Sequence, residues 1–266
     1  MQDRYAGDIG DYGKLGLLRY LQTKLTLALG VVWYLHRDET HTADGRFTEY
    51  LQCEDSRFRC CDPQLWLALR HLVHSGRRSV EEIRLSGVLR VGHTKPAFFT
   101  RPVDCSVTIP GQSAKQKKER REYRRKWNAD GLKKVRTKDL VFLDPDNGLE
   151  VASCSKKHQY KAGKYTFHDE VQKFAGQSRV LVIYHHLNRH SNHGTHQHQL
   201  VTQANRLQKL TGNAKNVFGL RYRPKSPRAF FVIADAALSS QTLSSLESFL
   251  ESAWRPFWDP QVVTPQ

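Results

Sequence analysis

The chain has 266 residues, and 42 Lys and Arg side chains against 26 Asp and Glu give it a formal net charge of +16. A hydrophobic content of 39% is enough for a substantial core and excludes wholesale disorder, and no apolar run approaches the roughly 20 residues of a membrane span. The charge indicates a polyanionic partner, which we expect to be DNA. Five cysteines without a CxxC pair are typical of reduced thiols in a cytoplasmic protein, and nothing indicates an obligate protein partner.

The first third of the sequence predicts a helix, a strand and two further helices. Leucines spaced four residues apart predict a helix that follows the glycine-rich stretch Gly7–Gly13 and ends near Gly30. The apolar run Val31–Leu35 is typical of a short buried strand. A proline in the first turn predicts a helix over Pro63–His74, and "SVEEI" from Ser79 has the acidic first turn of another helix.

The rest of the chain alternates predicted helices and strands. In chain order these are a basic helix at Ala114–Trp127, a strand at Leu140–Leu143, a helix at about Tyr165–Ala175, a strand at Arg179–His186, a helix at about Thr195–Leu210, a hairpin of Val217–Tyr222 and Arg228–Ala234, and a last helix at about Ser239–Trp254. This alternation predicts a Rossmann-like α/β fold, a mostly parallel sheet with helices on both faces and a C-terminal antiparallel hairpin. We expect a single α/β domain, residues 1–266, with a basic helical insertion at about 94–137.

An acidic turn, Asp-Pro-Asp-Asn-Gly, follows the predicted strand Leu140–Leu143. Ligands of mostly parallel sheets bind where the strands end, so Asp144, Asp146 and Asn147 are predicted to be catalytic. A carboxylate there can activate water, accept a proton from a base or, together with Glu150, ligate a metal. The alternative is a turn that only ends the strand.

The next predicted strand ends in two histidines, which can act as acid or base near neutral pH. His185 is predicted to be catalytic, and His186 is predicted to contact nucleic acid, as is Arg189 in the loop that follows. The histidine-rich stretch beyond the strand matches no zinc signature in its spacing, so no metal site is predicted.

Two further segments are predicted to contact nucleic acid. In the glycine-rich start of the chain, Asp8 and Asp11 are predicted to reach a ribose, a base or a water in the same pocket, and Lys14 to contact nucleic acid. The run 115–126 is strongly basic and carries only two glutamates, which favours phosphate binding over an ordinary solvated face. Its predicted contacts are Lys115, Lys117, Lys118, Arg120, Arg121, Arg124 and Arg125.

Three motifs resemble those of the ribosomal RNA adenine-N6 methyltransferases of the large-subunit type. "AGDIGDYGK" (6–14) is similar to their opening motif, "VVWYLHRDETHTADGR" (31–46) to their cofactor strand and loop, and "LVFLDPDN" (140–147) to their catalytic D-P-P-Y box. The resemblance spans most of the chain and implies a sheet that binds S-adenosylmethionine and is closed by a hairpin. The site residues it carries over are Asp144, Asp8, Asp11 and Lys14.

Two departures from that family favour a different reaction. In the cofactor loop, Ala43 replaces a glycine that lets the backbone approach the methyl donor, and Asp44 adds a carboxylate. In the catalytic box, Asp146 and Asn147 replace the second proline and the aromatic residue that stacks on a flipped base. A strand ending in Asp-Pro and a second strand ending in a histidine motif also resemble the uracil-DNA glycosylases.

The sequence therefore predicts a DNA glycosylase that flips a nucleotide, most simply a modified one, and hydrolyses its N-glycosidic bond without a cofactor. Processing of foreign DNA is a biological setting that fits this activity. The first alternative is an S-adenosylmethionine-dependent adenine-N6 methyltransferase, and a further one is a nucleic-acid-binding module without catalysis. A metal-dependent nuclease would instead use Asp144, Asp146, Glu150 and His185.

Overall fold

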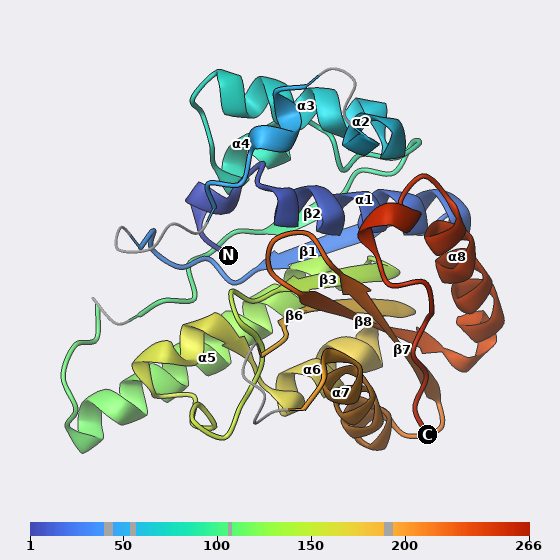
Figure 1. Cartoon of the computed structure of the whole chain (residues 1–266). Coiled ribbons are helices and arrows are strands. Elements are labelled where there is room, and N and C mark those ends of the chain that lie inside the picture. The colour runs from blue at the N-terminus through green and yellow to red at the C-terminus, as the bar shows by residue number, and fades with distance from the viewer. Residues whose placement is uncertain (40–44, 54–56, 106–107, 189–193) are drawn as a thin grey trace.

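A six-stranded sheet forms the centre of the computed structural model, which describes residues 1–39, 45–53, 57–105, 108–188 and 194–266 (Figure 1). Its strands are β1 (Leu29–Trp33), β2 (Ala97–Phe99), β3 (Leu140–Asp144), β6 (Val180–His186), β7 (Lys215–Tyr222) and β8 (Arg228–Asp235). The strand order is β2-β1-β3-β6-β8-β7, in which the first four are parallel and β8 runs antiparallel to both neighbours. A separate parallel pair joins β4 (Gly148–Leu149) to β5 (Tyr165–Thr166).

Helices cover both faces of the sheet (Figure 1). They are α1 (Ile9–Leu25), α2 (Arg57–Cys61), α3 (Pro63–His74), α4 (Val80–Leu85), α5 (Ala114–Val135), α6 (His168–Gln177), α7 (His196–Thr211) and α8 (Ser239–Glu251). One face carries α1 and α8, with α3 packed on α1, and the other face carries α5, α6 and α7. None of these helices is both long and apolar enough to cross a membrane, as far as the described residues go.

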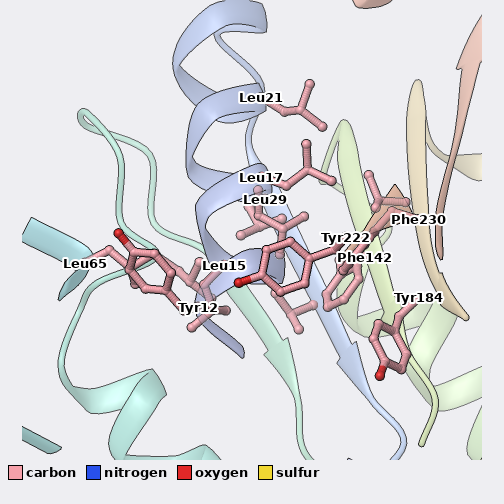
Figure 2. Packing of buried hydrophobic residues seen from close by; sticks show 14 of the residues in the cluster. Tyr12, Leu15, Leu17, Leu21, Leu29, Leu65, Phe142, Tyr184, Tyr222 and Phe230 are labelled. Carbon is pink, nitrogen blue, oxygen red and sulfur yellow. The ribbon is translucent and has the colours of Figure 1, made fainter. Parts of the chain in front are cut away.

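Each face of the sheet has its own hydrophobic core, because side chains alternate along a strand. In β3, Leu140 and Phe142 point into the core under α1, whereas Val141 and Leu143 point into the core under α5, α6 and α7. Figure 2 shows the first core, in which leucines of α1 lie close to Phe142 and to aromatic side chains of the following strands. Each large apolar side chain buried in this way contributes about 1.5–3 kcal/mol. The same alternation places Asp144 on the α1 face.

The predicted fold class is confirmed, and most element boundaries agree within a few residues. α5 continues past the predicted end at Trp127 to Val135. α1 differs at both ends: it starts at Ile9, inside the glycine-rich stretch, because Asp8 caps it, and it ends where Thr26 turns left-handed at φ 53°. α6 starts at His168 rather than near Tyr165, because Tyr165 already belongs to β5. The strand predicted at Val31–Leu35 lies two residues earlier, as β1.

The basic segment at about 94–137 contributes to the central sheet. It contains β2, which pairs with β1, and the whole of α5. Trp127 and Val135 of α5 are fully buried in the core under the sheet. The second half of α5 is therefore anchored on the sheet, while its first half is not.

Candidate active site at the carboxyl edge of the sheet

A pocket of about 340 Å³ lies at the carboxyl ends of β3 and β6. The acidic turn after β3, the last residues of β6, the first turns of α1 and the start of β8 all contribute to its wall. Of the residues predicted to be catalytic or to bind nucleic acid, the pocket is lined by Asp8, Lys14, Asp144, Asp146, Asn147 and His186. Segments far apart in the sequence therefore meet where the strand pattern predicted a site.

The first turn of α1 carries two of the predicted carboxylates. Asp8 is the N-cap: its Oδ1 accepts a hydrogen bond from the Asp11 N–H at 2.8 Å, which satisfies a free donor of the helix. Asp11 in turn accepts a hydrogen bond from the Gly7 N–H at 3.1 Å. Gly10 is inside the helix, and a Cβ there would lie 2.8 Å from the Arg228 guanidinium. The glycine at this position thus lets Arg228 approach the helix at the pocket wall.

Lys14 joins two buried carboxylates. Its Nζ lies 2.9 Å from Oδ1 of Asp11 and 3.0 Å from both carboxylate oxygens of Asp144. Burial opposes the charge of Lys14, but the two carboxylates outweigh it and raise the pKa of Lys14. Burial also raises the pKa of Asp144 and of Asp11, and Lys14 offsets only part of that effect. Lys14, which was predicted to contact nucleic acid, is thus ion-paired with Asp11 and with Asp144.

Asp146 has a different set of partners. Its Oδ2 accepts a hydrogen bond from Gln2 Nε2 at 3.0 Å and lies 3.3 Å from Nζ of Lys164. Burial acts to raise the pKa of Asp146, but the nearby amino terminus and Lys164 outweigh it and lower this pKa to about 2. Asp146 is therefore an ionised carboxylate in the pocket wall at neutral pH.

On β6 the residues that face the pocket are Tyr184 and His186. They share the face of Asp144 because side chains alternate along the strand. Tyr184 Oη lies 2.8 Å from Nε2 of His186. Burial, helped by Arg228, lowers the pKa of His186 to about 3, and burial raises the pKa of Tyr184 to about 12. Both side chains are therefore neutral at neutral pH.

His185 lies on the opposite face of β6 and holds the acidic turn in place. Its Nδ1 accepts a hydrogen bond from the Leu149 N–H at 3.1 Å, and burial lowers the pKa of His185 to about 4, which keeps this acceptor unprotonated. The backbone N–H of His186 donates a hydrogen bond to the Asn147 carbonyl at 3.1 Å. His185 was predicted to be catalytic, but it does not line the pocket and instead positions the turn that does.

Gly148 is the residue at which the acidic turn packs closely against β6. Its φ is +109°, and a Cβ there would lie 2.6 Å from the Cα of His185. We expect Gly148→Ala to destabilise the protein by about 2–4 kcal/mol, from backbone strain and overpacking together. Chemical denaturation measures this loss.

Gly87→Ala is the matched control for that substitution. Gly87 also has a left-handed φ, +69°, but nothing lies within 4 Å of a Cβ added there. Gly87→Ala should therefore destabilise the protein by the cost of backbone strain alone, about 1–2 kcal/mol. Equal losses for the two variants would show that contact with His185 does not hold the turn.

Glu150 lies apart from the carboxylates that line the pocket. Its Oε1 accepts a hydrogen bond from the His168 N–H at 2.8 Å and lies 2.7 Å from Nδ1 of the same histidine. Across the described ranges, no three His, Cys, Asp or Glu side chains are arranged to hold a metal ion. The residues of the predicted nuclease site are thus not gathered around one point.

The predicted nucleic-acid contacts of the basic segment fall into two groups. Arg120 and Arg124 are 1% and 3% exposed and donate hydrogen bonds to backbone carbonyls, so they belong to the interior of the protein. The others are exposed or half-buried along α5: Lys115, Lys117, Lys118, Arg121 and Arg125. Arg189 and the loop residues Ala43 and Asp44 lie outside the described residues.

Tyr184, Arg228, Phe47 and Lys164 are among the pocket residues that were not predicted from the sequence. Tyr184 is two residues before His186, so strand alternation could have found it. Arg228 pairs with His186 in the antiparallel register of β6 and β8, and the predicted hairpin brings it there. Phe47 and Lys164 also line the pocket, but they lie in segments without a periodic pattern and reach it only through tertiary packing.

No protein-family model matches this chain, and no curated protein matches it. We therefore infer its function from the chemistry of the pocket. The charge of the chain and the motifs within it add to that chemistry.

Proposed function

We propose that the protein is a DNA glycosylase that extrudes a nucleotide and hydrolyses its N-glycosidic bond, with modified bases of foreign DNA as the substrate. The observation that carries the proposal is the pocket at the carboxyl edge, where an ionised Asp146 and a neutral His186 line a volume of about 340 Å³. This volume is in the range of small-molecule sites and suits a base with its sugar. Tyr184 and Phe47 in the wall supply aromatic surface for the base.

The carboxylates would act on the sugar side of the bond. When the C1′–N bond breaks, positive charge develops on the sugar, and the ionised Asp146 would stabilise it. Asp8 forms no ion pair with any described residue, so its carboxylate is available to accept a proton from the attacking water. The water oxygen forms the new bond to C1′, and the base leaves with the electrons of the broken bond.

The opposite wall would stabilise the departing base. The Tyr184 hydroxyl can donate its proton to Nε2 of His186, which leaves the proton of the neutral ring on Nδ1 as a hydrogen-bond donor. Arg228 adds a positive charge to the same wall. Asn147 has both a donor and an acceptor with which to recognise the edge of the base. These groups would neutralise the negative charge that the leaving base acquires.

We expect base release without an added metal ion or methyl donor, because the proposed step uses side chains of the chain alone. The purified protein is incubated with DNA that contains modified and unmodified bases, with and without EDTA, and released bases are detected by mass spectrometry. Free base should form at the same rate in both samples, and strand breaks should appear only after alkali. Strand scission that requires magnesium and stops with EDTA would favour the nuclease instead.

A methyltransferase is the second candidate, and the closing hairpin supports it. The antiparallel pair of β7 and β8 agrees with the closing hairpin implied by the resemblance to the adenine-N6 methyltransferases. Asp144 at the end of β3 also has the place implied for their catalytic box. Calorimetry with S-adenosylmethionine tests this candidate. Tight binding, followed by methyl transfer to adenine, would replace the glycosylase, whereas no binding would leave the hydrolytic proposal in place.

A further inference from the structure

The first half of α5 extends past the carboxyl edge of the sheet, on the side of the pocket. α5 has 22 residues and so a length of about 33 Å, whereas the five residues of β3 span about 17 Å. Its C-terminal end is fixed at the amino edge, where a Cβ on Gly30 of β1 would lie 2.8 Å from Val135. The other end therefore projects beyond the strands, as Figure 1 shows.

The two buried arginines of α5 fasten a loop onto this projecting half. Arg120 donates from Nε to the His158 carbonyl at 2.8 Å, and Arg124 donates from Nη1 to the Ala162 carbonyl at 3.2 Å. Arg124 is also held by a buried ion pair with Glu170 at 2.7 Å. The loop 156–164 is therefore attached to α5 by charged hydrogen bonds, which cost several kcal/mol to break when buried.

Loop and helix together form a surface that is strongly basic. Nη1 of Arg121 lies 3.2 Å from Nδ1 of His158. The pKa of His158 is lowered by slight burial and then by the charges of Arg121, Lys117 and Lys156, so all of these groups are close in space. The loop also carries Lys161, which is exposed. We call this surface the basic ridge and define it as Lys117, Lys118, Arg121, Lys156, His158 and Lys161.

The loop that carries Lys156, His158 and Lys161 of the basic ridge ends at the pocket. Its last residue is Lys164, and Nζ of Lys164 lies 3.3 Å from Oδ2 of Asp146 in the pocket wall. Arg125 is not included, because it pairs with Glu122. A row of cations that starts beside the pocket and continues along a projecting helix has the shape needed by a chain of phosphates, whereas a single small anion would need only one or two of these groups.

We propose that the basic ridge binds the phosphate backbone of the single strand that continues from the nucleotide in the pocket. This inference rests on the proposed function for the identity of the group in the pocket. The proposed interface includes loop residues that were not predicted from the sequence. It excludes Arg120 and Arg124, which were predicted contacts, because they are buried and hold the loop. A strand bound there runs from the carboxyl edge of the sheet along the exposed face of α5.

The salt dependence of binding tests this proposal. Binding of a labelled single strand of about 20 nucleotides is measured by fluorescence anisotropy over a range of salt concentrations. Each phosphate contact on a single strand contributes a log–log slope of about −0.7, so Lys117→Gln/Arg121→Gln/Lys156→Gln should reduce the slope by about 2 units and weaken binding about 100-fold at 0.1 M salt.

The matched control removes three cations from the other end of the same helix. Lys133, Lys134 and Arg136 are exposed near the amino edge of the sheet, so Lys133→Gln/Lys134→Gln/Arg136→Gln should leave the slope unchanged within about half a unit. Equal losses for the two triple variants would show diffuse attraction by net charge and overturn the proposal. Binding to vesicles with anionic headgroups, but not to the oligonucleotide, would overturn it as well.

Base release separates this inference from the proposed function. If the ridge variant loses slope as expected but the wild-type protein releases no base, the ridge is confirmed and the glycosylase proposal fails. If the wild type releases base and the ridge variant keeps the full slope, the ridge proposal alone fails. Thermal unfolding midpoints of both triple variants within a few degrees of the wild type show that the fold is intact.

Discussion

Replacing Asp146 with asparagine is expected to slow base release by about 1000-fold while leaving nucleic-acid binding unchanged. The substitution keeps the shape of the side chain but removes the charge that would face the cationic sugar. Lys164 is not left unpaired, because it also pairs with Glu39. A single-turnover assay of base release measures the rate of the chemical step, and anisotropy with the same substrate measures binding.

Asp169→Asn is the matched control for the charge change. Asp169 is exposed on α6, pairs with Lys157 at 2.6 Å and does not line the pocket. Its variant should release base within about twofold of the wild-type rate, as surface substitutions away from a site usually do. An Asp146→Asn variant that keeps the wild-type rate would remove Asp146 from the mechanism.

Replacing Lys14 with methionine is expected to lower the free energy of unfolding by about 3–5 kcal/mol at pH 7.5, because it leaves two buried carboxylates without their cation. Denaturant titration followed by circular dichroism measures the loss. Lys24→Met, at the exposed end of the same helix, should change stability by less than about 1 kcal/mol. Adding Asp144→Asn to Lys14→Met should restore part of the loss, since it removes one of the two charges.

The loss in Lys14→Met should shrink as the pH falls. Burial already raises the pKa of Asp11 and of Asp144, and removing Lys14 takes away the largest effect that opposes it. Between the raised values and the unfolded carboxyl pKa of about 4, the folded variant binds more protons than the unfolded chain, so its stability increases toward pH 5. A deficit that stays constant or grows from pH 7.5 to pH 5 would contradict a buried ion pair.

The position of the site could be predicted from the sequence, because local patterns determine it. The apolar run before Asp144 predicted a strand, and the rule that ligands bind at carboxyl edges then placed the acidic turn in a pocket. The same reasoning placed His186 there through the strand that it ends. The opening aspartates were also expected in the pocket, and Asp8 lines it.

The roles of individual side chains could not be predicted in the same way, since they depend on the face of a strand and on tertiary partners. His185 and His186 are adjacent, and only the register of β6 shows which of them faces the pocket. Arg120 and Arg121 are adjacent in a run of cations, yet one is buried against backbone carbonyls and the other is exposed. Charge and spacing alone do not distinguish such neighbours.

The central claim, that the pocket hydrolyses an N-glycosidic bond, is tested most directly by the products that the protein forms from DNA. The protein is incubated with DNA without cofactor, and bases and sugars are analysed by mass spectrometry. We predict free base together with an abasic sugar, and both products about 1000-fold more slowly with Asp146→Asn. Intact bases that have gained a methyl group, or cut strands whose bases all remain attached, would contradict the account.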